Sequence, residues 1–193
     1  MPQYVVVASL LFLAPAAPTA PEPGPSWTPP VVHTLALFSV MRVSEAILWP
    51  HPFAQTSDFG RHYQEAFTKP PIFDSSRRAF EWDGDHWTIN VIGHGLLGSE
   101  LYLRARTCGF GWAGSLAFAA GSTVVWEYAF EGNGVRPSLL DLIYTPLSGL
   151  VLGEARHYAW RSADDISDPT WRAVVKAIVD PLGELERATV SGC

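Results

Sequence analysis

The sequence predicts an all-α protein, a small bundle of four or five helices that is embedded in a membrane or associated with one. Three observations lead to this fold class. Apolar segments of helical length follow one another through the second half of the chain, and the stretch from Thr107 to Trp126 carries no charged residue. Charged residues make up only 17% of the chain, against the usual quarter or so. Most of the eight tryptophans flank the apolar segments, as they do in the interfacial belts of membrane proteins.

The N-terminal residues predict export followed by a linker. An apolar stretch from Tyr4 to Leu13 precedes an Ala-Pro-Ala triplet that suits a signal peptidase, so residues 1–16 are expected to form a signal peptide. The stretch is too short to cross a bilayer, which needs about 20 apolar residues. The alternative is a disordered Ala/Pro-rich tail on a cytosolic protein. Under either interpretation the prolines make residues 17–30 a linker.

Residues 31–181 are expected to form one helical domain, followed by a C-terminal tail over residues 182–193. The first helix of the domain ends at the sequence WPHP, because proline restricts both itself and the residue before it. A loop of mixed polarity then runs to Trp87, with Pro-Pro and Asp-Gly-Asp turn signals. The predicted helices span Val31–Trp49, about Thr88–Arg106, about Trp112–Glu131, about Ser138–Trp160 and, as a last amphipathic helix, about Pro169–Ile178.

The net charge and the cysteines limit which partners and which cellular compartment the sequence allows. The net charge is −6 and no basic run occurs, so the chain has nothing to hold a phosphate backbone, and nucleic acid is excluded as a partner. The apolar composition makes membrane lipid the expected partner. The two cysteines, Cys108 and Cys193, allow either a single disulfide in an oxidising compartment or two unpaired thiols.

Each of the three central helices carries a stripe of small or polar residues at every fourth position. Positions four apart lie above one another on one face of a helix, and such faces let helices approach closely in a bilayer or in a dry bundle. Gly149 and Gly153 form a GxxxG pair on one of these faces. The stripes consist of Asn90, His94, Gly98 and Tyr102; of Ala119, Thr123, Glu127 and Glu131; and of Asp141, Thr145, Gly149 and Gly153.

A carboxylate at the end of an apolar helix, such as Glu127, costs free energy unless it is paired, solvated or bound to a cation. Its candidate partners are His94 on the preceding helix and Asp141 or Arg136 at the start of the next one. A histidine beside a carboxylate has a fixed tautomer and a raised basicity, which general bases and metal sites both use. The alternative is a structural hydrogen-bond network that orders the bundle and reacts with nothing.

Two further carboxylate motifs each allow a structural and a functional interpretation. Ser138 and Asp141 fit a helix capping box, which alone would account for both residues. Asp83 and Asp85, on either side of a glycine, could bind a hard cation, but this spacing is more often that of a solvated turn. The sequence therefore leaves the cofactor open, with a divalent metal as the one candidate.

These residues also carry a resemblance to a known family. The strings WDGDHWTINVIGHGLLGSELYLRARTCG, WEYAFE and PSLLDLIYTPLSGLVLGE resemble a bacterial family filed as domain of unknown function 3943. The resemblance covers roughly residues 42–181, and it implies an exported envelope protein with no established activity. A looser similarity of layout is to VanZ-like membrane proteins and small periplasmic lipoproteins. The family's motif positions fall here at Asp83, Asp85, Asn90, His94, Gly98, Tyr102, Arg106, Ser122, Trp126, Glu127, Glu131, Ser138, Asp141, Gly153 and Glu154.

One position departs from the family pattern. Gly95 follows His94 where the pattern has proline, so the helix is expected to continue through this point rather than to kink. The His94 side chain could then take another direction than in the family.

The predicted function is that of an exported cell-envelope membrane protein, periplasm-facing or associated with the outer membrane, with a polar site that acts on or binds a lipid or polyprenyl phosphate. In an enzyme, Glu127 would be the general base or a metal ligand, His94 its partner and Asp141 the orienting carboxylate. The alternatives are a non-catalytic envelope scaffold or assembly protein, and a binding module whose inter-helix groove takes an acyl chain. No nucleophile elbow, phosphate loop or zinc helix motif occurs, so the sequence selects no reaction class. The candidate substrate-binding residues are Asn90, Arg106, Glu131, Arg136 and Ser138, with Arg106 or Arg136 as an anion clamp.

Overall fold

The computed structural model describes residues 24–189 and Cys193, and these residues form helices joined by loops, with one isolated β-bridge between Ile72 and Ser138. The all-α fold class predicted from the sequence is therefore confirmed. The signal peptide predicted for residues 1–16 and the first part of the linker lie outside the described residues.

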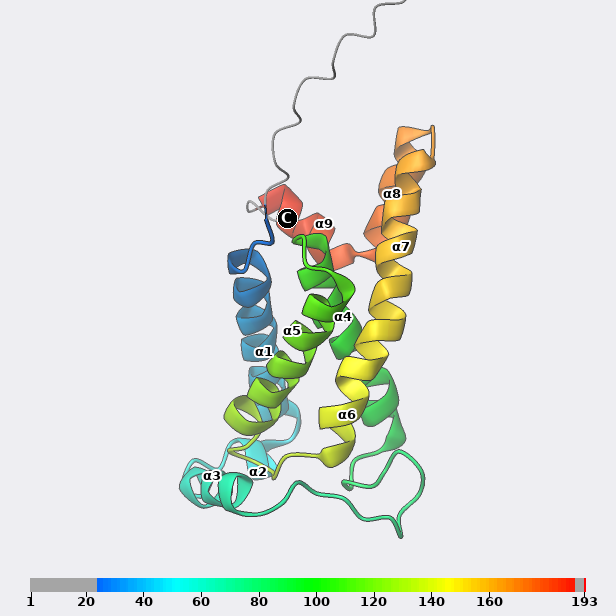
Figure 1. Ribbon diagram of the computed structural model, residues 1–193. Helices are drawn as coiled ribbons and strands as arrows, with labels where there is room; N and C mark the ends of the chain where they lie inside the picture. Colours follow the sequence, from blue (N-terminus) through cyan, green and yellow to red (C-terminus); the bar gives the residue numbers. More distant parts are fainter. Residues whose placement is uncertain (1–23, 190–192) are drawn as a thin grey trace, which may run out of the picture.

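Four long helices build the described bundle, and three of them contain a π-helical segment (Figure 1). The bundle has a terminal end, where the described N-terminal residues and Cys193 lie, and a loop end, which holds the connection of residues 69–87. The central helix is α4, because it contacts each of the other three. The long helices are α1 (Thr28–Leu48); η1 (Thr88–Gly93) with α4 (His94–Thr107); α5 (Trp112–Val125) with η2 (Trp126–Phe130); and α6 (Leu139–Ser148) with η3 (Gly149–Gly153) and α7 (Glu154–Ser162).

The bounds of these helices agree with the sequence prediction to within a few residues, with one informative difference. The first helix begins at Thr28, inside the segment expected to be a linker. Prolines occupy its first turn, where the missing N–H would have no helical partner, so they start this helix instead of preventing it. The helix through Gly95 is continuous, as the departure from the family pattern predicted, although the turn before it is π-helical.

Shorter helices lie at both ends of the bundle (Figure 1). The predicted amphipathic helix is α8 (Pro169–Val179); Asp168 caps it by accepting hydrogen bonds from two backbone N–H groups, and η4 (Ala163–Asp165) precedes it. The structure adds α2 (Pro50–Phe53) and α3 (Phe59–Thr68) at the loop end, in the segment expected to be a loop. It also adds α9 (Pro181–Thr189) over most of the expected C-terminal tail.

Glycines let α4 and the helix of α6 and η3 cross in direct backbone contact. A Cβ atom on Gly98 would lie 1.8 Å from the carbonyl oxygen of Thr145, and one on Gly149 would lie 2.5 Å from the carbonyl oxygen of Gly98. A Cβ atom on Gly153 would lie 2.7 Å from the ring of Tyr102. The small-residue stripes predicted from the sequence are thus the contact faces of these two helices.

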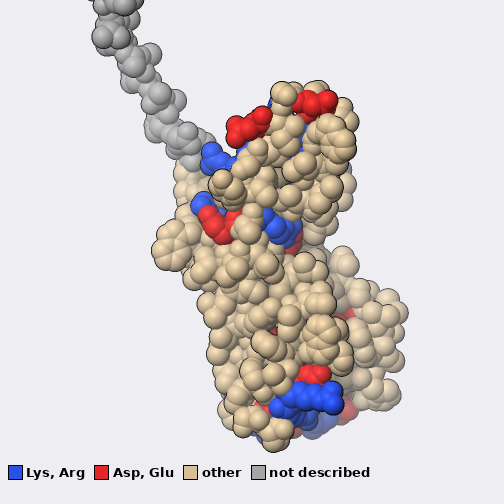
Figure 2. All heavy atoms as spheres, turned by 90° about the vertical axis from the view of Figure 1, so that its right-hand side faces the viewer, with Lys and Arg blue, Asp and Glu red and all other residues tan. Residues whose placement is uncertain are grey.

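Polar side chains fill much of the bundle interior, while apolar side chains cover much of its outside. Ile47 and Val151, for example, are 72% and 68% exposed. On the face shown in Figure 2, charged side chains gather toward the two ends and the middle carries few of them. The buried polar side chains include Thr34, Asn90, Ser115, Thr123, Glu127, Asp141, Thr145 and Asp180. This distribution is the reverse of that in a typical water-soluble bundle.

A disulfide joins Cys108, just after α4, to Cys193 at the end of the chain. Of the two states that the sequence allowed for these cysteines, the structure has the paired one. The backbone N–H of Ser26 also donates a hydrogen bond to the carbonyl oxygen of Cys108, 3.0 Å away. The two ends of the described chain are therefore held together at the terminal end of the bundle.

Candidate functional site

Three buried side chains from three different long helices meet toward the loop end of the bundle. His94 begins α4, Glu127 lies in η2 and Asp141 lies in the first turn of α6. They are 7%, 1% and 2% exposed, and each offers one ligand atom within 4.8 Å of the other two. The His94 Nε2 atom lies 3.5 Å from an Asp141 carboxylate oxygen. The structure thus brings together the three residues that the sequence grouped.

Two of these residues owe their direction to π-helical turns. His94 directly follows η1, and Glu127 is the second residue of η2. A π turn holds one more residue than an α turn, so it shifts the residues that follow around the helix axis. Such turns occur frequently at functional sites, because they aim a side chain where regular helical spacing would not place it.

Neighbouring groups hold each of the three side chains in one orientation. The Nδ1 atom of His94 lies 3.0 Å from the Thr145 hydroxyl, so a proton on Nδ1 leaves the Nε2 lone pair facing the carboxylates. The backbone N–H of Ser138 donates to Glu127 Oε2 at 2.8 Å. The Ser138 hydroxyl accepts from the backbone N–H of Asp141 at 3.2 Å, the capping bond that the sequence indicated.

Asp83 fastens the connection of residues 69–87 to this site. One of its carboxylate oxygens accepts from the Ser138 hydroxyl at 2.6 Å, and the other accepts from the side-chain amide of Asn90 at 2.8 Å. The same oxygen accepts from the backbone N–H of Asp85 at 3.0 Å, in a turn around Gly84. Asp83 is therefore a positioning residue, since it orders two neighbours of the cluster.

Replacing Asp83 by alanine is expected to loosen this connection. The change removes the acceptor for Asn90 and Ser138, and an unsatisfied buried polar group costs about 1–3 kcal/mol. Hydrogen exchange of residues 74–87 should accelerate. The matched control is Asp74→Ala, which removes an exposed carboxylate of the same connection that bonds to Ser76 and Arg77. Equal exchange in both variants would contradict the positioning role.

The cluster contains acceptor atoms that no donor reaches. Glu127 Oε1, Asp141 Oδ1 and Asn90 Oδ1 are all buried, and none has a hydrogen-bond partner among the described residues. The ion pairs found in the described chain also give neither carboxylate a Lys or Arg partner. Buried polar atoms are normally satisfied, so three oxygens without a donor beside an imidazole form a set of atoms that either protons or a bound cation would satisfy.

A second buried polar network lies nearer the terminal end and differs in having matched charges. Glu100 accepts from Arg104 at 3.1 Å and from Arg156 at 2.9 Å, and its carboxylate lies 3.3 Å from His33. Asp180 accepts from Arg104 and Arg187. Since each carboxylate has a guanidinium partner, this network is explained by joining α9 to the bundle and requires no ligand.

The remaining predicted site residues lie outside the cluster. Arg106 lies toward the terminal end, where it forms two hydrogen bonds with Glu154, and Arg136 is half-buried in the connection between η2 and α6. The structure therefore gives no anion clamp of Arg106 beside His94. Asp85 and Glu131 instead line a separate cavity at the loop end.

These two carboxyl groups have shifted pKa values, and a third carboxyl group of the same cavity belongs to Glu45. Burial, and after it the neighbouring carboxylate of Asp83, raises the pKa of Asp85. Burial, followed by the carboxylates of Glu127 and Glu45, raises the pKa of Glu131 well above its usual range. Glu45 and Thr145 are not among the site residues predicted from the sequence, although Glu45 is a lone carboxylate near the end of an apolar helix. The loop end therefore holds more carboxyl groups than the sequence predicted for the site, and their raised pKa values favour the protonated form unless a cation lies among them.

One comparison with known proteins found a family match for this part of the chain. A family model described as "Domain of unknown function (DUF3943)" matches residues 79–182, a segment that contains all three cluster residues. No curated protein and no solved structure matches the chain.

Proposed function

The chain belongs to the family described as a domain of unknown function (DUF3943), and we propose that it is an exported membrane protein whose bundle holds a divalent metal ion between His94, Glu127 and Asp141. The observation that carries the proposal is the convergence of unpartnered carboxylate oxygens on an imidazole nitrogen inside the bundle. Ligands of a tetrahedral zinc ion lie about 3.3 Å apart when each metal bond is about 2.0–2.1 Å. The 3.5 Å between His94 Nε2 and Asp141 fits such a pair.

The three ligand residues limit which metal ions the site suits and what chemistry such an ion would supply. One imidazole and two carboxylates suit zinc, manganese or iron in the divalent state. Three protein ligands leave coordination positions open, and the buried Asn90 Oδ1, one helical turn before His94, is a third oxygen without a hydrogen-bond donor. A metal with an open position acts as a Lewis acid toward a phosphate or carbonyl oxygen, which fits a lipid or polyprenyl phosphate as the bound molecule. The site itself selects no reaction.

Three observations support a location within a membrane. The helix α1 is long and apolar enough to cross a bilayer, with a mean hydropathy of 1.5 over a window that is 17% buried. The other three long helices match a span in length, at roughly 20 residues each, whereas α1 alone among the described helices is also apolar enough. Exposed apolar side chains surround them, and the charges on the face in Figure 2 lie toward the ends. The disulfide supports export, because disulfides persist in oxidising compartments.

Fractionation of cells that express the full chain tests the membrane part of the proposal. The protein should remain in the membrane pellet after carbonate extraction and enter solution only with detergent. Mass spectrometry should show that the first sixteen or so residues have been removed. A soluble protein that retains Met1 would contradict both export and membrane insertion.

Elemental analysis tests the metal part. Protein purified in detergent and dialysed against zinc or manganese should retain about one ion per chain, and more at pH 8 than at pH 5, because its ligands must be deprotonated. A well-folded protein that retains no ion would favour the alternative, a scaffold whose polar cluster is purely structural.

A further inference from the structure

Two cavities follow one another along the groove between α1 and the helix formed by η1 and α4. On α1, Leu37 and Met41 line the first cavity, and Glu45 and Trp49, one and two turns further on, line the second. On the facing helix, Gly93 lines the first cavity and Ile89, one turn earlier, lines the second. Their volumes are about 570 and 460 Å³.

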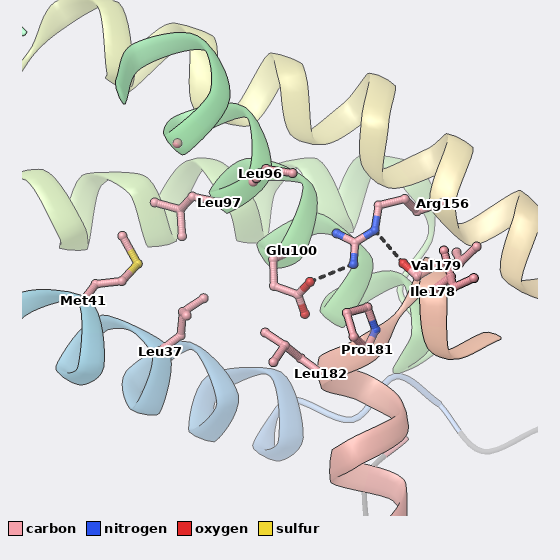
Figure 3. A pocket seen from close by; sticks show the side chains of 11 residues that line it. Leu37, Met41, Leu96, Leu97, Glu100, Arg156, Ile178, Val179, Pro181 and Leu182 are labelled. Carbon is pink, nitrogen blue, oxygen red and sulfur yellow. Dashed lines mark hydrogen bonds and ion pairs between the residues drawn. The ribbon is translucent and has the colours of Figure 1, made fainter. Parts of the chain in front are cut away.

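The first cavity offers a hydrocarbon surface (Figure 3). Its two charged residues, Glu100 and Arg156, bond to each other at 2.9 Å. Arg156 also donates to the carbonyl oxygen of Val179 at 2.8 Å and to the Ser99 hydroxyl at 2.8 Å, so neither charge is free for a ligand. Apolar side chains make up most of the remaining lining, including Leu37, Met41, Leu96, Leu97, Ile178 and Leu182.

The second cavity has the opposite character. Glu45, Asp85 and Glu131 line it, and its lining, all of it in the described chain, includes no Lys or Arg. The Oε2 atom of Glu45 is buried and lacks a hydrogen-bond partner among the described residues. Trp49 and Phe53 also line it, and the Arg42 guanidinium lies 5.1 Å from the centroid of the Phe53 ring. Carboxylates together with aromatic faces are the groups that bind an organic ammonium ion, and the cavity is far larger than a metal ion needs.

The cavities also lie beside the metal cluster. Ile89 and Gly93 in their walls directly precede Asn90 and His94 in the sequence, and His94 belongs to the cluster, although none of the three cluster residues lines either cavity. The carboxylate of Glu131 interacts electrostatically with those of Glu127 and Asp141. A molecule in the groove would therefore extend from an apolar section, past the metal centre, to an acidic section.

We propose that this groove binds one phospholipid with an ammonium headgroup. An acyl chain fills the first cavity, the ammonium group lies among Glu45, Asp85 and Glu131, and the phosphate between them faces the metal centre. The inference rests on the proposed function, because the phosphate contact requires the metal. It goes further by assigning the class of lipid, since an anionic headgroup such as glycerol phosphate would meet three carboxyl groups in a lining that includes no Lys or Arg.

Native mass spectrometry of the full-length protein in detergent tests the proposal. Dioleoyl phosphatidylethanolamine and dioleoyl phosphatidylglycerol are added at equal concentrations, so the acyl chains are identical and only the headgroup differs. The protein should retain the ethanolamine lipid about tenfold better, and Glu45→Gln should remove most of this preference. Equal retention of both lipids by the unaltered protein would overturn the proposal.

Two controls keep the result interpretable. Glu65→Gln removes a carboxylate of α3 at the same end of the bundle that pairs with Arg61 and Lys69, and it should leave the preference intact. Metal content is measured in the same samples, and Glu45→Gln should retain its metal. A protein that prefers the ethanolamine lipid but carries no metal would contradict the metal centre and support the groove. A protein that carries the metal but shows no lipid preference would support the metal centre and overturn the groove proposal.

Discussion

Glu127→Gln is expected to abolish metal binding while the bundle remains folded. The amide has nearly the size of the carboxylate, and its oxygen can still accept the hydrogen bond from the backbone N–H of Ser138. The change nevertheless removes an anionic ligand and leaves only His94 and Asp141 of the three. Loss of a neighbour that merely orients a ligand costs 10–100-fold in affinity, so loss of a ligand should cost about 100-fold or more. Metal titration in detergent measures the affinity, and circular dichroism confirms the fold.

The control for this variant is Glu154→Gln. Glu154 is a partly exposed carboxylate that bonds to Tyr102 and Arg106 toward the terminal end, so its loss should leave the metal in place. Glu127→Leu should lose the metal and also about 1–3 kcal/mol of stability, since the Ser138 N–H then has no acceptor. If the cluster is only a structural network, the Gln variant should leave stability nearly unchanged, and Leu should cost only the hydrogen bond from Ser138. That pattern, together with unaltered protein that binds no metal, would contradict the account.

Gly98→Ala is expected to cause the largest loss of stability among single methyl additions to the described glycines. The new Cβ atom would lie 1.8 Å from the carbonyl oxygen of Thr145, where it meets backbone rather than a movable side chain. The two helices must separate, at a cost of about 3 kcal/mol or more. Because the crossing also positions His94 and Thr145, metal affinity should fall as well.

Thermal unfolding in detergent measures this effect, with Gly121→Ala as the control. Gly121 lies in α5, and a Cβ atom there would meet nothing within 4 Å. Alanine should therefore leave stability unchanged or raise it by up to about 1 kcal/mol through its higher helix propensity. Similar melting temperatures for both variants would show that α4 and α6 do not cross as closely as described.

The long helices could be predicted because their signals are local. An apolar stretch of sufficient length bounded by proline, as at the WPHP sequence after α1, defines a helix without knowledge of its neighbours. The helix α3 has no such signal. Its position depends on tertiary contacts, in which the Tyr63 hydroxyl donates to the carbonyl oxygen of Ala129 and the His62 ring bonds to the carbonyl oxygen of Asn133. Such contacts between residues far apart in the chain cannot be predicted from the local sequence.

Part of the candidate site could also be predicted, because its residues follow a local spacing along the helices. Spacing by four residues grouped His94, Glu127 and Asp141 on facing stripes, and the need of a buried carboxylate for a partner made them a cluster. The same geometry argues against Arg106 as a clamp, since twelve residues of helix place it about 18 Å from His94 along the axis. Predicting Glu45 as a residue near the site would have required knowing that α1 packs beside α4, and no local sequence pattern shows this.

The most direct test of the central claim is anomalous X-ray scattering from crystals of the full chain grown with zinc or manganese. Data collected at the absorption edge of the added metal should show a peak about 2.0–2.2 Å from His94 Nε2 and from one carboxylate oxygen each of Glu127 and Asp141. A peak at this position would establish the metal centre. The same three side chains in hydrogen bonds with one another or with water, and no anomalous peak between them, would contradict it.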